Sequence, residues 1–351
     1  KSMKIIKKIT SKIHVGTPEV GNGDIYVMVM GDSTINGGCH RALYNYGFVP
    51  NIHCVGLRLN SNQQYDEGRG GWTLKMYSSI TIDSEESYNP YWQPKGNNVY
   101  LGSTGFWKNA WLCKRGTQPS GFEPQYSCGR YDTYVTLFDE STGYFLNPKE
   151  GYMMYDTSQE TFKVYSDGSW INTTSDSYSW GHSFKYLSAF NIHIPDYFIM
   201  NLGLNDFWNK IPTASDFAEW NSMVNSLISA FHETNPNGYF ILSICTVSVG
   251  CMDNEEEVDT NMQHASMWLS KKNIIENYDN RDEEKIFVVD SSLMVDSENA
   301  FHCTSEVVAH PLNTDITATK NIQSGIPHFY NGYNAWAIPL AAFIQYTRTD
   351  K

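Results

Sequence analysis

The chain has 351 residues, of which 41% are hydrophobic, and this supplies enough apolar material for the core of one large domain. Its formal net charge is −13, with 38 acidic residues against 25 Lys and Arg, which argues against a nucleic-acid or anionic-membrane partner, because either needs a basic patch. No apolar run approaches the roughly 20 residues of a membrane-spanning helix, so we expect no membrane span.

Seven cysteines are present, but no Cys-x-x-Cys pair or Cys/His cluster has the spacing of a zinc site. We therefore expect no metal ion and no other cofactor. Cys113 with Cys128, and Cys245 with Cys251, are near enough in sequence to form disulfides. The odd number leaves at least one thiol free unless it pairs between chains.

After a lead-in segment at residues 1–24, a short apolar run over 25–31 predicts a buried strand. The run leads directly into Gly31-Asp32-Ser33-Thr34, where small and polar residues end the strand. In an open α/β sheet, ligands and reactive groups gather at this carboxyl end of the strands. Ser33 is therefore placed like a nucleophile, although Asp32 and Ser33 could equally cap a following helix.

A second short strand is expected within 51–59, followed by Asp66-Glu67-Gly68-Arg69-Gly70-Gly71-Trp72-Thr73. Three glycines in four residues predict a loop whose backbone N–H groups can approach a reacting oxygen. The spacing of a phosphate-binding P-loop is absent. An ordinary tight turn is the alternative interpretation.

The segment from about 84 to 182 has a different character, because it is rich in Tyr, Gly, Ser, Asn and Trp and lacks helical periodicity. Alternation at 143–146 and 161–166 is typical of strands in an antiparallel meander. We interpret the segment as a β-rich insertion whose aromatic side chains require burial. Aromatic residues such as Trp72, Trp107, Trp111 and Tyr330 could line a substrate cleft or belong to the core.

The α/β pattern resumes at Pro195 with a buried strand over 196–202 that runs into Gly203-Leu204-Asn205-Asp206. The remaining expected elements alternate in type: helices over 214–233, 255–277 and 332–346, and strands over 239–244 and 285–290. Strands that alternate with helices predict a three-layer, doubly wound, mostly parallel sheet of the flavodoxin-like type. Residues 25–350 would form this α/β domain, interrupted by the insertion.

Four separated stretches resemble, in order, the motifs of the SGNH (GDSL-type) hydrolase superfamily, which is named for its Ser, Gly, Asn and His. They are Gly31-Asp32-Ser33, Gly70-Gly71-Trp72-Thr73, Gly203-Leu204-Asn205-Asp206 and residues 325–333, Gly-Ile-Pro-His-Phe-Tyr-Asn-Gly-Tyr. The resemblance covers about 25–82 and 195–346. Each motif alone is a weak signal, and the ordered set is a strong one.

The resemblance implies that Ser33 is the nucleophile and His328 the general base. It implies an oxyanion hole made by the backbone N–H of Ser33, the backbone N–H of Gly71 and the side-chain amide of Asn205. Asp32 and Asp206 are expected to support their loops by accepting backbone hydrogen bonds. A metal site built from Asp32, Asp206 and His328 is disfavoured, because nothing shows a defined ligand set.

The C-terminal stretch departs from the family pattern, which reads Asp-x-x-His-Pro followed by Gly-Tyr. Here the order is Pro327-His328, and Gly325 stands where the acid is expected. A backbone carbonyl or a distant acid such as Asp315 would then orient the imidazole. His310, followed by Pro311 and preceded by Glu306, is a rival match, but it lies before an expected Asn313-Thr314-Asp315 turn and far from Gly332-Tyr333.

These features predict a serine esterase that acts by acyl transfer on an acylated small molecule or glycan, such as an O-acetylated carbohydrate. The carbohydrate follows from the resemblance and from the aromatic content of the chain. The alternatives are a lipase or thioesterase-like acyl hydrolase, and an inactive scaffold of this family that binds glycans. A secreted or cell-surface location is expected, with a cytoplasmic one left open.

Overall fold

The computed structural model describes somewhat more than half of the chain, and everything below concerns those residues. They are 23–36, 43–44, 49–56, 58–59, 65–78, 81–82, 87–88, 92–94, 100–103, 150, 153–156, 159, 161–174, 178–180, 184, 193–208, 210–244, 260–294, 303–310, 313–323 and 333–349.

The centre of the molecule is a seven-stranded sheet whose five principal strands are parallel. These strands are β1 (Ile25–Gly31), β2 (Ile52–Val55), β13 (Tyr197–Asn201), β14 (Tyr239–Ser243) and β15 (Ile286–Val289). They lie side by side in the order β2-β1-β13-β14-β15, so the chain order reverses between β1 and β13. This is a doubly wound order with its switch point at that position.

Two further strands extend the sheet beside the carboxyl end of β1. β4 (Tyr65–Gly68) runs parallel to β1, pairing Gly68 with Gly31, and β3 (Arg58–Leu59) pairs antiparallel with β4. The first three residues of the glycine-rich stretch, 66–68, are therefore strand and not loop, which corrects the sequence interpretation. The single strand expected within 51–59 is divided into β2 and β3.

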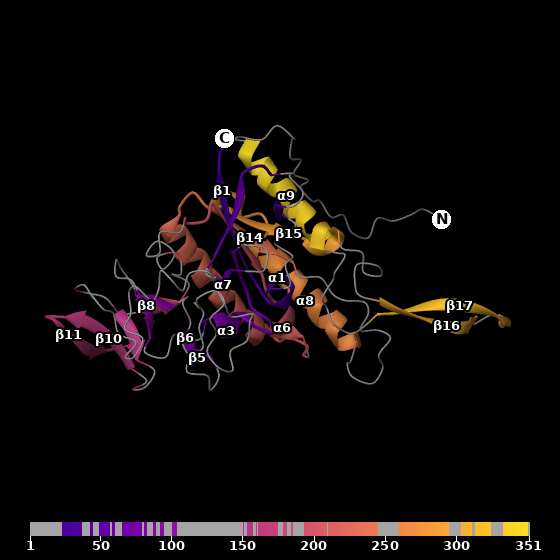
Figure 1. Cartoon of the computed structure of the whole chain (residues 1–351), viewed down its shortest axis with the longest axis horizontal. Coiled ribbons are helices and arrows are strands. Elements are labelled where there is room, and N and C mark those ends of the chain that lie inside the picture. The colour runs from indigo at the N-terminus through magenta and orange to yellow at the C-terminus, as the bar shows by residue number, and fades with distance from the viewer. Residues whose placement is uncertain are drawn as a thin grey trace, which may run out of the picture.

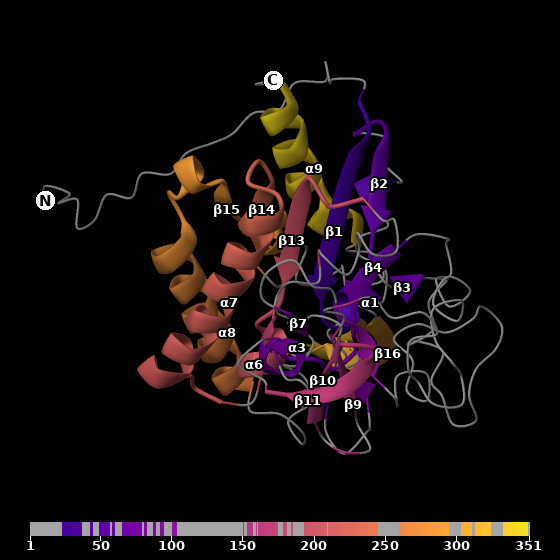
Figure 2. The ribbon, with the colours of Figure 1, turned by 90° about the vertical axis from the view of Figure 1, so that its left-hand side faces the viewer.

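Both faces of the sheet are apolar, because alternate side chains of a strand point to opposite faces. Met28 and Met30 share one core cluster with helix α7 (Ala214–Thr234) and helix α8 (Thr260–Tyr278). Val27 and Val29 share the other core cluster with helix α9 (Tyr333–Thr349). Figure 1 and Figure 2 show α7 and α9 on opposite sides of the sheet, so the fold has three layers.

The three long helices agree with the sequence prediction to within a few residues. The apolar stripe of α7 is buried through Trp220, Val224, Leu227, Ile228 and Phe231. Its start is fixed by a capping box, in which the Thr213 side chain accepts a hydrogen bond from the Asp216 amide and Asp216 bonds the Thr213 amide in return. The first residues expected for α8, 255–259, lie outside the described part of the chain.

Smaller sheets lie within the segment that the sequence marks as β-rich. One has the order β11-β10-β9-β8 and contains β8 (Tyr100–Ser103), β9 (Met153–Asp156), β10 (Thr161–Ser166) and β11 (Ser169–Thr173). In that sheet β9, β10 and β11 pair antiparallel, whereas β8 pairs parallel with β9. Two antiparallel pairs are β7 (Trp92–Pro94) with β12 (Tyr178–Trp180), and β5 (Thr81–Ile82), just before the segment, with β6 (Ser87–Tyr88). The strand expected at 161–166 is confirmed, and the one at 143–146 lies outside the described residues.

A long hairpin that the sequence analysis missed is formed by β16 (Cys303–His310) and β17 (Asn313–Gln323). The expectation of a turn at Asn313-Thr314-Asp315 was wrong, because these residues begin β17. The hairpin projects away from the main sheet (Figure 1), and its final paired residues are His310 and Asn313. In the described part of the chain, no helix combines the length and apolarity that crossing a membrane would require.

Candidate active site

Three of the stretches singled out in the sequence meet at the carboxyl edge of three adjacent strands. The strands lie in the order β4-β1-β13, and the last residue of β1, Gly31, is in register with Gly68 of β4 and Asn201 of β13. Ser33, Gly71 and Asn205 follow these three strand ends within a few residues. The fold thus brings the three segments together at its switch point, where open α/β sheets bind ligands.

The turn after β1 is tight and approaches β13 closely. A Cβ atom on Gly31 would lie 2.2 Å from Cγ1 of Ile35 and 3.0 Å from the carbonyl oxygen of Asn201, so only glycine fits there. Asp32 is fully buried, and its Oδ1 accepts hydrogen bonds from the Thr34 amide at 2.9 Å and the Thr34 hydroxyl at 2.8 Å. Asp32 therefore caps the short helix α1 (Ser33–Asn36), at whose start Ser33 is half-buried.

The turn after β4 carries Gly71, whose φ of 75° lies in the left-handed region that favours glycine. The next residues are tied to the turn after β13. Asn205 Nδ2 donates to the Trp72 carbonyl oxygen at 3.1 Å. The Leu74 amide, at the start of helix α3 (Leu74–Ser78), donates to Asp206 Oδ1 at 2.9 Å. These two bonds hold the glycine turn against helix α6 (Leu204–Phe207).

A buried ion pair supports the same edge from inside, and sequence reasoning missed it. Arg69 Nη1 contacts Glu67 Oε2 at 2.8 Å, with both side chains almost fully buried. The guanidinium also lies over the rings of Trp72, at 5.2 Å, and Tyr77, at 5.4 Å. The Tyr77 hydroxyl donates to the Gly31 carbonyl oxygen at 2.7 Å. Arg69, Glu67 and Tyr77 together therefore link the glycine-rich turn to the Ser33 turn. The sequence signal was an arginine between glycines, two residues after a glutamate.

Two buried carboxyl groups lie behind these turns. Burial raises the pKa of Asp32 from 3.8 to about 6, against the opposing effect of its hydrogen bonds from Thr34. Burial also raises the pKa of Asp206 to about 7; the hydrogen bond from Leu74 opposes this, and the negative charge of Asp32 adds to it. Oδ2 of each aspartate lacks a hydrogen-bond partner among the described residues. Each of the two side chains accepts a backbone hydrogen bond, from Thr34 and from Leu74 respectively.

Of the two candidate histidines, only His310 lies on a described element. His328 lies outside the described residues, in the stretch just before α9. His310 ends β16 at the turn of the projecting hairpin, and Asp315 lies on β17 of the same hairpin. No group of three or more His, Cys, Asp or Glu within the described residues is arranged to hold a metal ion.

The described strands of the central sheet include one cysteine. Cys54 is a free, buried thiol on β2, and burial raises its pKa to about 12, so it stays protonated at neutral pH. The four cysteines considered for disulfides, at 113, 128, 245 and 251, lie outside the described residues.

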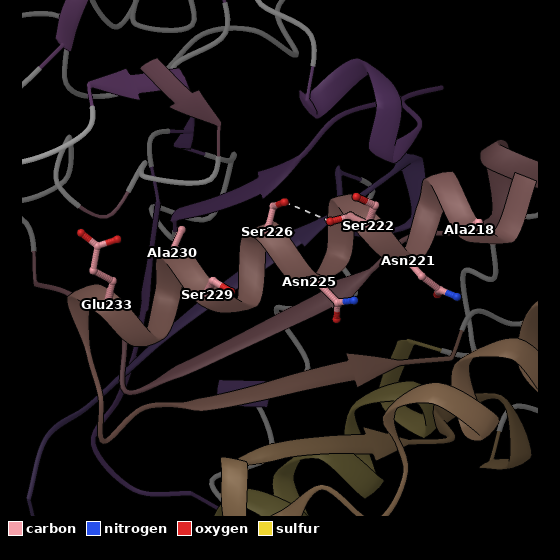
Figure 3. A pocket seen from close by; sticks show the side chains of 8 residues that line it. All are labelled: Ala218, Asn221, Ser222, Asn225, Ser226, Ser229, Ala230 and Glu233. Atoms are coloured by element: carbon pink, nitrogen blue, oxygen red, sulfur yellow. Dashed lines mark hydrogen bonds between the residues drawn. The ribbon is translucent and has the colours of Figure 1, made fainter. Parts of the chain in front are cut away.

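Two cavities lined by residues that the structure describes flank α7. One, of about 260 Å³, lies behind the glycine turn and is lined by Thr73, Lys75, Asp206, Phe207, Lys210, Asp216, Glu219, Trp220 and Met223. The other, of about 590 Å³, runs along an outer face of α7, where Figure 3 shows its lining of serine, asparagine, alanine and one glutamate side chain. Neither cavity is lined by Ser33, Gly71 or Asn205.

No protein-family model matches this chain, and no curated protein sequence matches it. Among solved structures, the chain is similar to a possible lipase from Chitinophaga pinensis, with 10% identity and a TM-score of 0.36 over 92% of this chain and 98% of that one. It is similar to a Clostridium thermocellum family 3 carbohydrate esterase, with 12% identity and a TM-score of 0.36 over 91% and 94% of the two chains.

A third similar structure is a carbohydrate esterase family 2 enzyme with a carbohydrate-binding domain, from Corynascus thermopiles (Myceliophthora fergusii). The identity is 11% and the TM-score 0.38, over 95% of this chain and 69% of that one. The strand order and the helix layers of the chain itself make it an α/β protein with a mostly parallel, doubly wound sheet.

Proposed function

We propose that this protein is a serine ester hydrolase of the SGNH (GDSL) type that acts on an acylated small molecule or glycan. The observation that supports this most is the meeting of three motifs at one edge of the sheet. Ser33, Gly71 and Asn205 follow adjacent strand ends, and hydrogen bonds from Asn205 and to Asp206 join two of the three turns. A nucleophile and convergent oxyanion donors are what acyl transfer requires.

In this proposal the Ser33 hydroxyl attacks the carbonyl carbon of the ester and forms a new C–O bond. His328 takes the hydroxyl proton and returns it to the alkoxide that leaves when the original ester C–O bond breaks. Water, activated by the same histidine, then hydrolyses the acyl-serine and restores the enzyme. The negative charge on the tetrahedral oxygen is stabilised by the N–H groups of Ser33 and Gly71 and by the amide of Asn205.

The Asn205 amide can donate to the Trp72 carbonyl oxygen and to the substrate oxygen at the same time. A primary amide has two N–H hydrogens. One of them reaches the Trp72 carbonyl oxygen, and this bond orients the side chain. The other is then available to the substrate oxygen, so the donor is preorganised before the charge develops.

The substrate proposed is an O-acylated, and in particular an O-acetylated, carbohydrate at a secreted or cell-surface location. The aromatic content of the chain and the sequence resemblance support it. Hydrolysis of 4-nitrophenyl acetate should therefore be faster than that of the butyrate and octanoate esters, and acetylated xylan should release acetate. A preference for the octanoate would instead indicate a lipase or thioesterase-like enzyme.

The nucleophile is tested by Ser33→Ala, which should lower kcat by at least about 10⁴-fold because it removes the covalent route. The matched control is Ser226→Ala on the exposed face of α7, which should retain full activity. Mass spectrometry after treatment with diisopropyl fluorophosphate should show one adduct on the wild type and none on Ser33→Ala. Equal rates for Ser33→Ala and wild type would end the assignment, and wild-type glycan binding without turnover or labelling would indicate an inactive scaffold.

A further inference from the structure

A chain of buried polar side chains runs beneath the Ser33 turn, outside the roles proposed so far. Its members come from four elements that are distant in sequence: α1, β13, β14 and α9. They are Thr34, Asn201, Ser243 and Trp336, and each is at most 4% exposed. We propose that Thr34 and Asn201 are positioning residues, which hold the Ser33 turn in place against β13, β14 and α9; this inference rests on the function proposed above.

The Thr34 hydroxyl is the first link. It donates to Asp32 Oδ1 at 2.8 Å and accepts from Asn201 Nδ2 at 3.1 Å. The Thr34 amide donates to the same carboxyl oxygen at 2.9 Å. Both sides of Ser33 in the chain are thereby fixed, since Asp32 precedes it and Thr34 follows it.

Asn201 is the centre of the network. It is the last residue of β13, in register with Gly31, and its Oδ1 accepts from the Ser243 hydroxyl at 3.0 Å and from Trp336 Nε1 at 3.2 Å. The Ser243 hydroxyl also lies 3.1 Å from Ser291 Oγ, a second acceptor, so the network extends to Ser291. One amide side chain thus contacts the nucleophile turn, the next strand and the helix on the far layer.

The network lies directly beneath Ser33 and holds the segment that carries it. A buried polar group that loses its partner is costly, so a connected set of such groups favours one arrangement over small displacements. The Ser33 backbone N–H and hydroxyl are carried on the segment that Thr34 and Asp32 fix. A shift of this segment would misalign the nucleophile and one oxyanion donor together, and a 1 Å misplacement can cost about 100-fold in rate.

The first test compares Thr34→Val, which keeps the shape and removes the hydroxyl, with Thr34→Ser, which keeps the hydroxyl. With 4-nitrophenyl acetate, Thr34→Val should lower kcat by about 10–100-fold and change KM by less than about 3-fold. Thr34→Ser should keep most of the wild-type kcat. The rate of labelling by diisopropyl fluorophosphate should fall in parallel. Equal kcat values for the two folded variants would overturn the proposal.

The second test stands even if Thr34→Val fails to fold. Trp336→Phe keeps an aromatic ring and removes the N–H that reaches Asn201. Its control is Tyr197→Phe, which removes another buried hydrogen bond between β13 and α9. That bond joins Tyr197 Oη to Thr347 Oγ1 at 2.8 Å. It lies at the opposite end of each element from the bond between Asn201 and Trp336. Both variants should lower the Tm, but only Trp336→Phe should lower kcat, by about 5-fold or more.

The outcomes separate this inference from the function beneath it. If the wild type neither hydrolyses esters nor reacts with diisopropyl fluorophosphate, the proposed function fails. If the wild type is active and Trp336→Phe loses no more kcat than Tyr197→Phe, the network is structural only and the positioning role is wrong.

Discussion

At the scale of single residues, the unusual groups are two buried carboxyl groups behind the site, those of Asp32 and Asp206. Asp206 accepts the Leu74 amide through Oδ1, and burial is the main reason that its pKa rises to about 7. A carboxyl group whose pKa is higher in the folded state binds its proton more tightly there than in the unfolded chain. Its stabilising contribution is fully present below about pH 3.8 and is lost as the pH rises through about 7.

Asp206→Asn should therefore weaken the dependence of stability on pH. Asparagine keeps an oxygen for the Leu74 amide and removes the charge. Urea unfolding should show that the wild type loses about 2–3 kcal/mol between pH 5 and pH 8 through this group, and that the variant does not. Asp167→Asn, an exposed turn residue between β10 and β11, is the control and should follow the wild type. A variant with the full wild-type pH dependence would show that Asp206 is not the titrating group.

At the scale of elements, both the buried face and the first turn of α7 follow from its own sequence. Its stripe of buried side chains covers one face of the sheet, and its first turn is closed by the Thr213 and Asp216 capping box. The Thr213 hydroxyl accepts from the Asp216 amide at 3.3 Å, and Asp216 Oδ2 accepts from the Thr213 amide at 2.8 Å. Two N–H groups that the helix itself leaves unbonded are thus satisfied.

Thr213→Ala should lower the free energy of unfolding by about 1 kcal/mol, which is the usual value of an N-cap. Thr213→Ser, which keeps the accepting oxygen, should lose less than half of that. Chemical denaturation of the three proteins at one pH measures the difference. The kcat should not change, because the cap lies on the helix and not on the turns that carry Ser33, Gly71 and Asn205. Equal losses for the two variants would mean that the side-chain oxygen does not carry the effect.

At the scale of the whole molecule, the parallel sheet decides which distant segments meet. β1 and β13 are adjacent in the sheet although they are far apart in the sequence. The Tyr26 amide, for example, donates to the Asp196 carboxylate, which is 170 residues away in the chain. The rival histidine, His310, is not on this sheet but on a separate two-stranded one. His310 is at the turn of a hairpin that projects away from the sheet (Figure 1).

We therefore expect His328→Ala to be as damaging as Ser33→Ala, and His310→Ala to retain most of the activity. Asp315→Asn should also have little effect, since Asp315 lies on the projecting hairpin. The double variant Ser33→Ala/His328→Ala should be no worse than either single one, because nucleophile and base act as a unit. The measurement is kcat/KM on 4-nitrophenyl acetate for each purified variant. An inactive His310→Ala beside an active His328→Ala would show that the histidine is misassigned.

The sequence by itself determined the fold class and the position of the Ser33 and Asn205 motifs after a strand end. Apolar runs of five to seven residues that stop at Gly31 and before Gly203 are local signals, and so is the stripe of α7. Only the tertiary structure decided that Glu67 belongs to a strand, that Arg69 is buried against it, and that Asn201 joins Thr34 to Trp336. These facts depend on pairing between segments far apart in the chain. A periodic pattern reports which face of an element is buried but not which element covers it, so no local rule could supply them.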